Sequence, residues 1–89
     1  MDKKRCILLF KNRLRRTLIA YRAKLGISQE KMAQILHIFA RAYVSLEKGT
    51  SFFSAWSLIF LLLNLPTELQ LELLQGLCED VRASGDEAA

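Results

Sequence analysis

Proline and glycine are scarce in this sequence, and their scarcity favours a helical protein. The 89 residues include one proline and four glycines, so few turns can use the residues that β-hairpins and long loops require. Leucine, alanine, glutamate, lysine and arginine, which favour helices, predominate. The composition predicts an all-α fold, and the length predicts one small domain.

Residues that catalyse reactions or hold metals are also few. His37 is the only histidine, and Cys6 and Cys78 lie near opposite ends of the chain without metal-ligand spacing. No glycine-rich phosphate-binding loop is present, and a disulfide framework would need more cysteines. We therefore expect no enzymatic activity, no cofactor and no metal site.

No apolar run is long enough to cross a membrane. The run 6–10 is short and is followed at once by Lys11, and the run 58–65 is interrupted by Asn64. We expect a reduced, cytoplasmic protein with no membrane contact. A hydrophobic content of 52% is nevertheless high for so small a protein, which indicates apolar surface kept for a partner.

Acidic residues are nearly absent from the first half of the chain. Residues 1–50 contain twelve lysines or arginines against Asp2, Glu30 and Glu47, a net charge of +9, whereas residues 51–89 have a net charge of −5. The basic half predicts contact with a polyanion. Its N-terminal part, residues 3–16, would track DNA phosphates or enter a minor groove as an arm, unless it is only a solvated helix face.

Apolar residues recur at three- and four-residue steps and predict a bundle of five helices. Gly26 and Gly49 are expected to end helices, Ser28 and Ser54 to cap them, and Pro66 to open the last one. Residues 1–82 would form the domain, and residues 83–89 a flexible acidic tail. The expected helices cover about residues 7–25, 28–36, 39–49, 54–64 and 66–82.

Two short motifs stand in the middle of the chain, Gly26-Ile27-Ser28-Gln29-Glu30 and Leu46-Glu47-Lys48-Gly49. Tyr21-Arg22 precedes them, and Met32, Ala33, Leu36, Ile38 and Tyr43 lie between them. With these motifs, residues 14–65 resemble the lambda-repressor/Cro-like (XRE-type) helix-turn-helix DNA-binding family. The resemblance implies that the second and third helices form the helix-turn-helix and that the third enters the major groove.

The resemblance also implies roles for individual residues. Arg22 and Glu47 occupy the positions of the family's bridging ion pair, which we interpret as part of the scaffold. Gln29 occupies a position that binds a DNA phosphate. On the outer side of the third helix, Arg41 is the best donor for a guanine edge. The predicted DNA-binding residues are Gln29, Ala40, Arg41, Val44, Ser45, Lys48 and Thr50.

The turn between these helices departs from the family at two positions. His37 replaces the usual glycine in a left-handed conformation, which costs about 1–2 kcal/mol. Phe39 replaces a capping Ser or Thr, a loss of about 1 kcal/mol. Packing of its ring on a neighbouring helix or a partner would offset part of this loss. Both changes are expected to lower stability without preventing the fold.

The fourth helix has more apolar residues than one core-facing side needs. The family resemblance implies that Ala55, Leu58, Ile59, Leu62 and Leu65 face the core, which leaves a second apolar stripe on the helix. The fifth helix would cover that stripe within the chain or across a second subunit. We favour a homodimer, because twofold symmetry suits DNA half-sites. The predicted interface residues are Trp56, Phe60, Leu63, Leu73 and Leu77.

These features predict a transcriptional regulator of the repressor or controller type that binds double-stranded DNA as a homodimer. Two alternatives stay open. One is the antitoxin of a toxin–antitoxin pair, with a toxin or another regulator as protein partner. The other is a protein-interaction module that keeps the fold without binding a specific DNA sequence.

Overall fold

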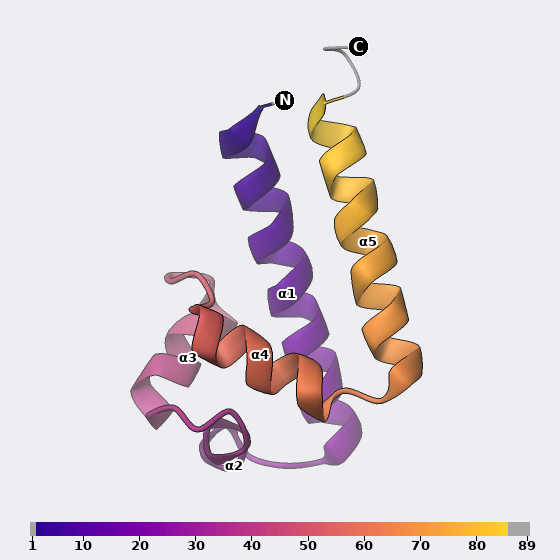
Figure 1. The fold of residues 1–89 in the computed structure, drawn as a ribbon. Coiled ribbons are helices and arrows are strands. Elements are labelled where there is room, and N and C mark those ends of the chain that lie inside the picture. The colour runs from indigo at the N-terminus through magenta and orange to yellow at the C-terminus, as the bar shows by residue number, and fades with distance from the viewer. Residues whose placement is uncertain (1, 86–89) are drawn as a thin grey trace.

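Five helices form the part of the chain that the computed structural model describes, residues 2–85, and no strand occurs there (Figure 1). The predicted all-α class is therefore confirmed. The long helices α1 and α5 lie side by side and antiparallel, while α2, α3 and α4 gather at the end of α1 that leads into α2 (Figure 1). The helices are α1 (Lys3–Leu25), α2 (Gln29–Ile35), α3 (Ala40–Lys48), α4 (Ala55–Asn64) and α5 (Thr67–Gly85).

Capping residues determine most helix ends, as the sequence predicts. Gly26 and Gly49 adopt left-handed backbone conformations, with φ of 65° and 78°, at the ends of α1 and α3. The hydroxyl of Ser28 accepts a hydrogen bond from an amide in the first turn of α2 at 3.0 Å. Ser54 and Ser57 form a capping box at the start of α4. These local contacts satisfy backbone groups that a helix end leaves without partners.

Helix α1 begins earlier than predicted, because the carboxylate of Asp2 accepts a hydrogen bond from the Arg5 amide at 3.1 Å and caps the helix. Lys3, Lys4 and Arg5 therefore lie in the first turn of α1. Of the alternatives for this basic segment, these three residues lie on a helix and do not form a separate arm.

Helix α5 continues to Gly85, so the predicted boundary at residue 82 lies too early. Ser84 is fully buried, and its hydroxyl donates a hydrogen bond to the carbonyl of Asp80 at 2.8 Å. Its own carbonyl accepts a hydrogen bond from the Asp2 amide at 2.9 Å, which joins the far ends of α1 and α5. The rest of the predicted tail, residues 86–89, lies outside the described residues.

The core draws on all five helices, and α4 faces it partly as predicted: Leu65 is buried, and Leu58 and Leu62 pack against the buried cluster. Leu61 is fully buried, whereas Ile59, which we expected inside, is 53% exposed, and Ala55 is also exposed. Leu73, predicted at the dimer interface, belongs to this core and is not available to a partner. The buried core residues are Leu14, Leu18, Tyr21, Met32, Ala33, Leu36, Tyr43, Leu46, Leu61, Leu65 and Leu73.

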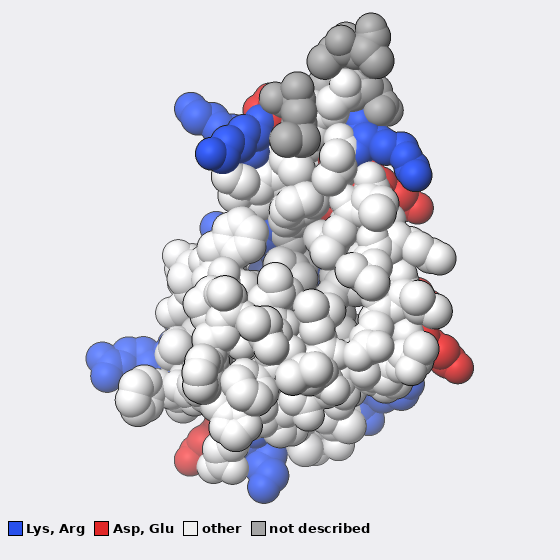
Figure 2. All heavy atoms as spheres, in the orientation of Figure 1, with Lys and Arg blue, Asp and Glu red and all other residues white. Residues whose placement is uncertain are grey.

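One face of the molecule, with α4 in front, carries almost no charge (Figure 2). On α4 the exposed apolar residues recur at helical spacing, and Leu63 is 71% exposed. A similar exposed stripe follows α5. Leu77 is only partly buried, at the edge of the core. We call the exposed set the α4–α5 apolar surface: Trp56, Ile59, Leu63, Leu71, Leu74 and Val81.

An ion pair between Arg13 and Asp80 fastens α5 to α1. The guanidinium donates to both carboxylate oxygens, from Nε at 2.8 Å and from Nη2 at 3.0 Å, and Asp80 is only 6% exposed. The guanidinium passes directly over Gly76, where an added Cβ would lie 2.1 Å from Nη1 of Arg13. The missing side chain at Gly76 is therefore what allows Arg13 to reach Asp80.

Substitution Gly76→Ala is expected to lower the free energy of unfolding by about 2 kcal/mol, because the new methyl group displaces Arg13 from Asp80. Helix propensity alone predicts the opposite, a gain of about 1 kcal/mol. Urea unfolding at neutral pH shows whether the free energy of unfolding falls or rises. In an Arg13→Ala background the same substitution should become neutral or stabilising. Equal destabilisation in both backgrounds would show that Arg13 is not the group displaced.

Candidate nucleic-acid interface

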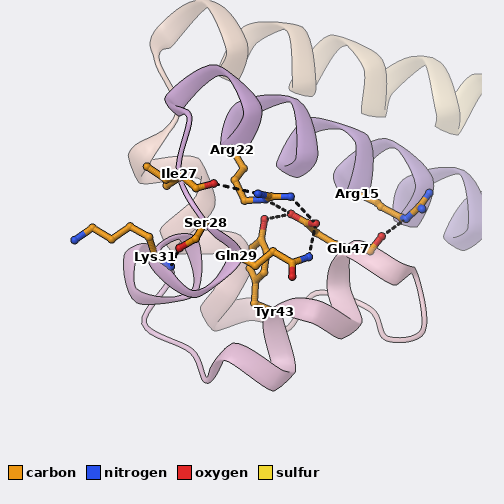
Figure 3. A network of polar contacts seen from close by, with 8 residues as sticks. All are labelled: Arg15, Arg22, Ile27, Ser28, Gln29, Lys31, Tyr43 and Glu47. Atoms are coloured by element: carbon orange, nitrogen blue, oxygen red, sulfur yellow. Dashed lines mark hydrogen bonds and ion pairs between the residues drawn. The ribbon is translucent and has the colours of Figure 1, made fainter.

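A buried carboxylate, that of Glu47 near the end of α3, connects the first three helices (Figure 3). Arg22 of α1 donates to it from Nε at 2.6 Å and from Nη2 at 3.2 Å. Gln29 of α2 donates from Nε2 at 2.9 Å, and the hydroxyl of Tyr43 donates one turn earlier on α3. The predicted Arg22–Glu47 ion pair is therefore present, with Glu47 only 8% exposed.

Further contacts of α1 hold the two ends of this network. The Nη1 of Arg22 donates to the carbonyl of Ile27 at 3.0 Å, in the segment between α1 and α2. The Nε of Arg15 donates to the backbone carbonyl of Glu47, at the C-terminal end of α3 (Figure 3). Both arginines of α1 thus act within the protein and orient α3.

The network shifts the ionisation of its members. Burial by itself would raise the pKa of Glu47, but the hydrogen bonds from Arg22, Tyr43 and Gln29 outweigh it and lower that pKa below 4.5. The hydrogen bond to Glu47 raises the pKa of Arg22 further above its ordinary value. Burial, together with the neighbouring carboxylate, raises the pKa of Tyr43. At neutral pH the pair is ionised and the tyrosine keeps its proton.

The turn between α2 and α3 is held by aromatic residues of α4. His37 has a φ of 57°, the left-handed conformation that its position predicts. Its carbonyl accepts a hydrogen bond from Nε1 of Trp56 at 3.0 Å, and its ring lies 4.4 Å from that of Phe60. The Trp56 and Phe60 rings are themselves 5.1 Å apart. These contacts offset part of the backbone cost at His37, and they give Trp56 and Phe60 an intramolecular role that the interface prediction did not include.

The outer side of α3 carries the residues predicted to meet DNA. Ala40 and Arg41 are exposed, and the Arg41 guanidinium has no hydrogen-bond partner within residues 2–85. Val44 and Ser45 are half-buried, and the Ser45 hydroxyl donates to the Arg41 carbonyl at 3.3 Å. Arg41 is therefore the long, uncommitted donor on this side of the helix.

The predicted phosphate-binding residues occupy different settings. Lys48 and Thr50 are exposed at the end of α3, and the Thr50 hydroxyl donates to the Ser45 carbonyl at 3.3 Å. Gln29 is half-buried, and its amide nitrogen binds Glu47. Its bond to Glu47, which sequence reasoning missed, makes Gln29 part of the scaffold and leaves one amide hydrogen for a phosphate.

Phe39 starts α3 without a side-chain capping bond within the described chain, as its residue type predicts. Its ring is 85% exposed, the highest value among the large hydrophobic residues of the described chain. Of the two ways in which the ring could offset the missing cap, packing on a neighbouring helix does not occur within residues 2–85.

Two features are missing from residues 2–85. Among residues 2–85, no three histidine, cysteine or carboxylate side chains gather where they could hold a metal ion. No helix of the described chain has the length and apolar character that a membrane span requires. Comparisons of the chain with protein-family models, curated proteins and solved structures found no match.

Substitution Glu47→Gln is expected to lower the free energy of unfolding at pH 7 by about 3–5 kcal/mol, because it leaves Arg22 without its buried partner. The pKa of Glu47 is lower in the folded state than its ordinary 4.5. Its ionic contribution is therefore complete above about pH 4.5 and is lost as the pH falls through the folded-state pKa. The difference in stability between wild type and variant should accordingly narrow in acid.

Chemical unfolding monitored by circular dichroism at pH 7 and pH 3 measures both effects. Glu30→Gln, on an exposed carboxylate in the first turn of α2, is the control and should change stability by no more than about 0.5 kcal/mol. A Glu47→Gln protein as stable as wild type at pH 7 would contradict the role given to the network.

Proposed function

We propose that this protein is a sequence-specific DNA-binding regulator of transcription, with α3 as the element that enters the major groove. The observation that carries the proposal is the exposed, uncommitted Arg41 on a helix that the buried Glu47 network holds in place. A rigid helix that presents an arginine fork suits bidentate recognition of guanine. The surplus of basic residues in the first half of the chain supports the same partner.

Each outer residue of α3 then has a defined task. Arg41 donates to O6 and N7 of a guanine, while Ala40 and Val44 provide apolar contacts to base edges. Ser45 adds a short polar contact. Lys48 and Thr50, together with the remaining amide hydrogen of Gln29, bind phosphates and set the register on the duplex.

We further propose that two copies associate through the α4–α5 apolar surface. Leu63, Leu71 and Leu74 on this surface are each at least half exposed, and covering such residues removes apolar area from water. Charges lie at the rim of the visible face (Figure 2). A twofold axis there would present two α3 helices to successive half-sites of one duplex. Compared with the interface predicted from the sequence, this one adds Ile59, Leu71, Leu74 and Val81 and leaves out Leu73 and Leu77. It also leaves out Phe60, whose ring packs against His37 in the turn between α2 and α3.

A protein-interaction module without a specific DNA site is the second candidate. The same α4–α5 apolar surface favours it, since Trp56 and its neighbours would equally suit a different protein. A toxin bound there would make this chain an antitoxin. Sequence selectivity for DNA distinguishes this candidate from the regulator.

Selection from random duplexes at about 0.1 M salt should enrich a palindromic site. Arg41→Ala should weaken binding to that site roughly 5- to 150-fold, because one bidentate guanine contact is lost. Fluorescence anisotropy with the selected duplex measures the change. Arg82→Ala, an equal charge change on α5, is the control and should change binding to the selected duplex little. Binding that is only salt-sensitive, with no enriched site, would favour the interaction module.

Substitution of Leu63 and Leu74 together by glutamate should convert a dimer to a monomer, because two like charges would face each other across the apolar surface. Light scattering during size-exclusion chromatography measures the mass. Leu25→Glu is the control: it changes an exposed apolar residue at the end of α1, outside this surface, and should leave the dimer intact. A Leu63→Glu/Leu74→Glu protein of unchanged mass would exclude this interface.

A further inference from the structure

We propose that Phe39 is a specificity-determining residue that reads the C5-methyl group of a thymine beside the base pair read by Arg41. This inference rests on the proposed function and adds the chemistry of a second base contact. It begins from the position of the ring, which is 85% exposed at the N-cap of α3. In helix-turn-helix docking, the N-terminal residues of the recognition helix lie against base edges.

Phe39 has no structural use in the isolated chain that explains its presence. It gives no capping bond to α3, and its ring buries little apolar area. A serine or threonine at this place would stabilise the helix. We therefore infer that the Phe39 ring contacts a bound partner.

Phe39 lines an apolar hollow with Ile38, Ala42 and Trp56, and the charge of the neighbouring Arg41 favours DNA as the partner that meets its ring. The next two residues are Ala40, which is too small to cover the ring, and Arg41, whose charge attracts a polyanion. The backbone of Phe39 is fixed, because its carbonyl accepts the Tyr43 amide at 3.0 Å and begins the hydrogen-bond ladder of α3. A phenylalanine has only two side-chain torsions to immobilise, so an anchored backbone presents the ring at low entropic cost.

Thymine is the base whose chemistry fits an aromatic ring at this place. Of the four DNA bases, thymine alone places a methyl group in the major groove, where it accepts apolar contact. The ring of Phe39 offers no hydrogen bond, so it distinguishes thymine from cytosine through this methyl group. The half-site should therefore combine a thymine near Phe39 with a guanine near Arg41.

The test replaces thymines of the selected duplex by uracil, one at a time, which removes the methyl group and keeps every hydrogen-bonding atom. Anisotropy at fixed salt should show one thymine per half-site whose replacement weakens wild-type binding roughly three- to tenfold. Phe39→Ala should weaken binding to the thymine duplex by a similar factor and should bind the thymine and uracil duplexes equally. Replacing the same thymine by 5-methylcytosine should weaken binding less than replacing it by cytosine.

Two controls separate this contact from folding effects. Phe52→Ala, at another exposed phenylalanine in the segment between α3 and α4, should retain the preference for thymine over uracil. Phe39→Ser restores a capping hydroxyl and should raise Tm while it weakens binding, whereas a purely structural role would move both in the same direction.

The thymine contact of Phe39 and the sequence-specific binding on which it rests can fail separately in these experiments. An enriched site with no position sensitive to uracil, or a Phe39→Ala protein that still prefers thymine, would overturn the inference and leave sequence-specific binding in place. Failure to enrich any site would overturn the proposed function itself.

Discussion

The buried carboxylate of Glu47 is the interaction on which the arrangement of α1, α2 and α3 depends. Donors from these three helices meet it: Arg22, Gln29 and Tyr43. A helix of nine residues such as α3 is too short to be stable alone. Because an unpaired buried charge is costly, the three helices must assemble together. The same contacts fix the side of α3 that faces outward, and with it the positions of Arg41 and Phe39.

Features coded by neighbouring residues could be predicted from the sequence. Gly26, Ser28, Gly49 and Ser54 mark helix ends through contacts within one turn, and the helix ends at these residues are as expected. The side of α4 that faces the core was predicted only in part: Leu58, Leu62 and Leu65 lie in or against the core, but Leu61 was missed and Ile59 is exposed. That helix is apolar all around, so periodicity does not distinguish Leu61 from Ile59, and only packing against the other helices selects the buried side.

Contacts between residues far apart in the sequence were also missed. Gln29 to Glu47 and Trp56 to His37 are hydrogen bonds between different elements, and each residue has a reasonable role in isolation. Trp56 connects the proposed DNA-binding side of α3 with the α4–α5 apolar surface. Its N–H donates to the turn before α3, and its ring lies on the apolar surface. A partner that covers this ring would therefore also act on the start of α3.

The central claim is that the outer side of α3, oriented by Glu47, is the surface that meets DNA. Amide chemical shifts of the ¹⁵N-labelled protein, followed during titration with duplex DNA at low salt, test it most directly. The account predicts the largest changes at residues 39–45, with further changes at Lys48 and Thr50 and small ones over residues 71–81 of α5. Changes confined to α4 and α5, with α3 unaffected, would contradict it.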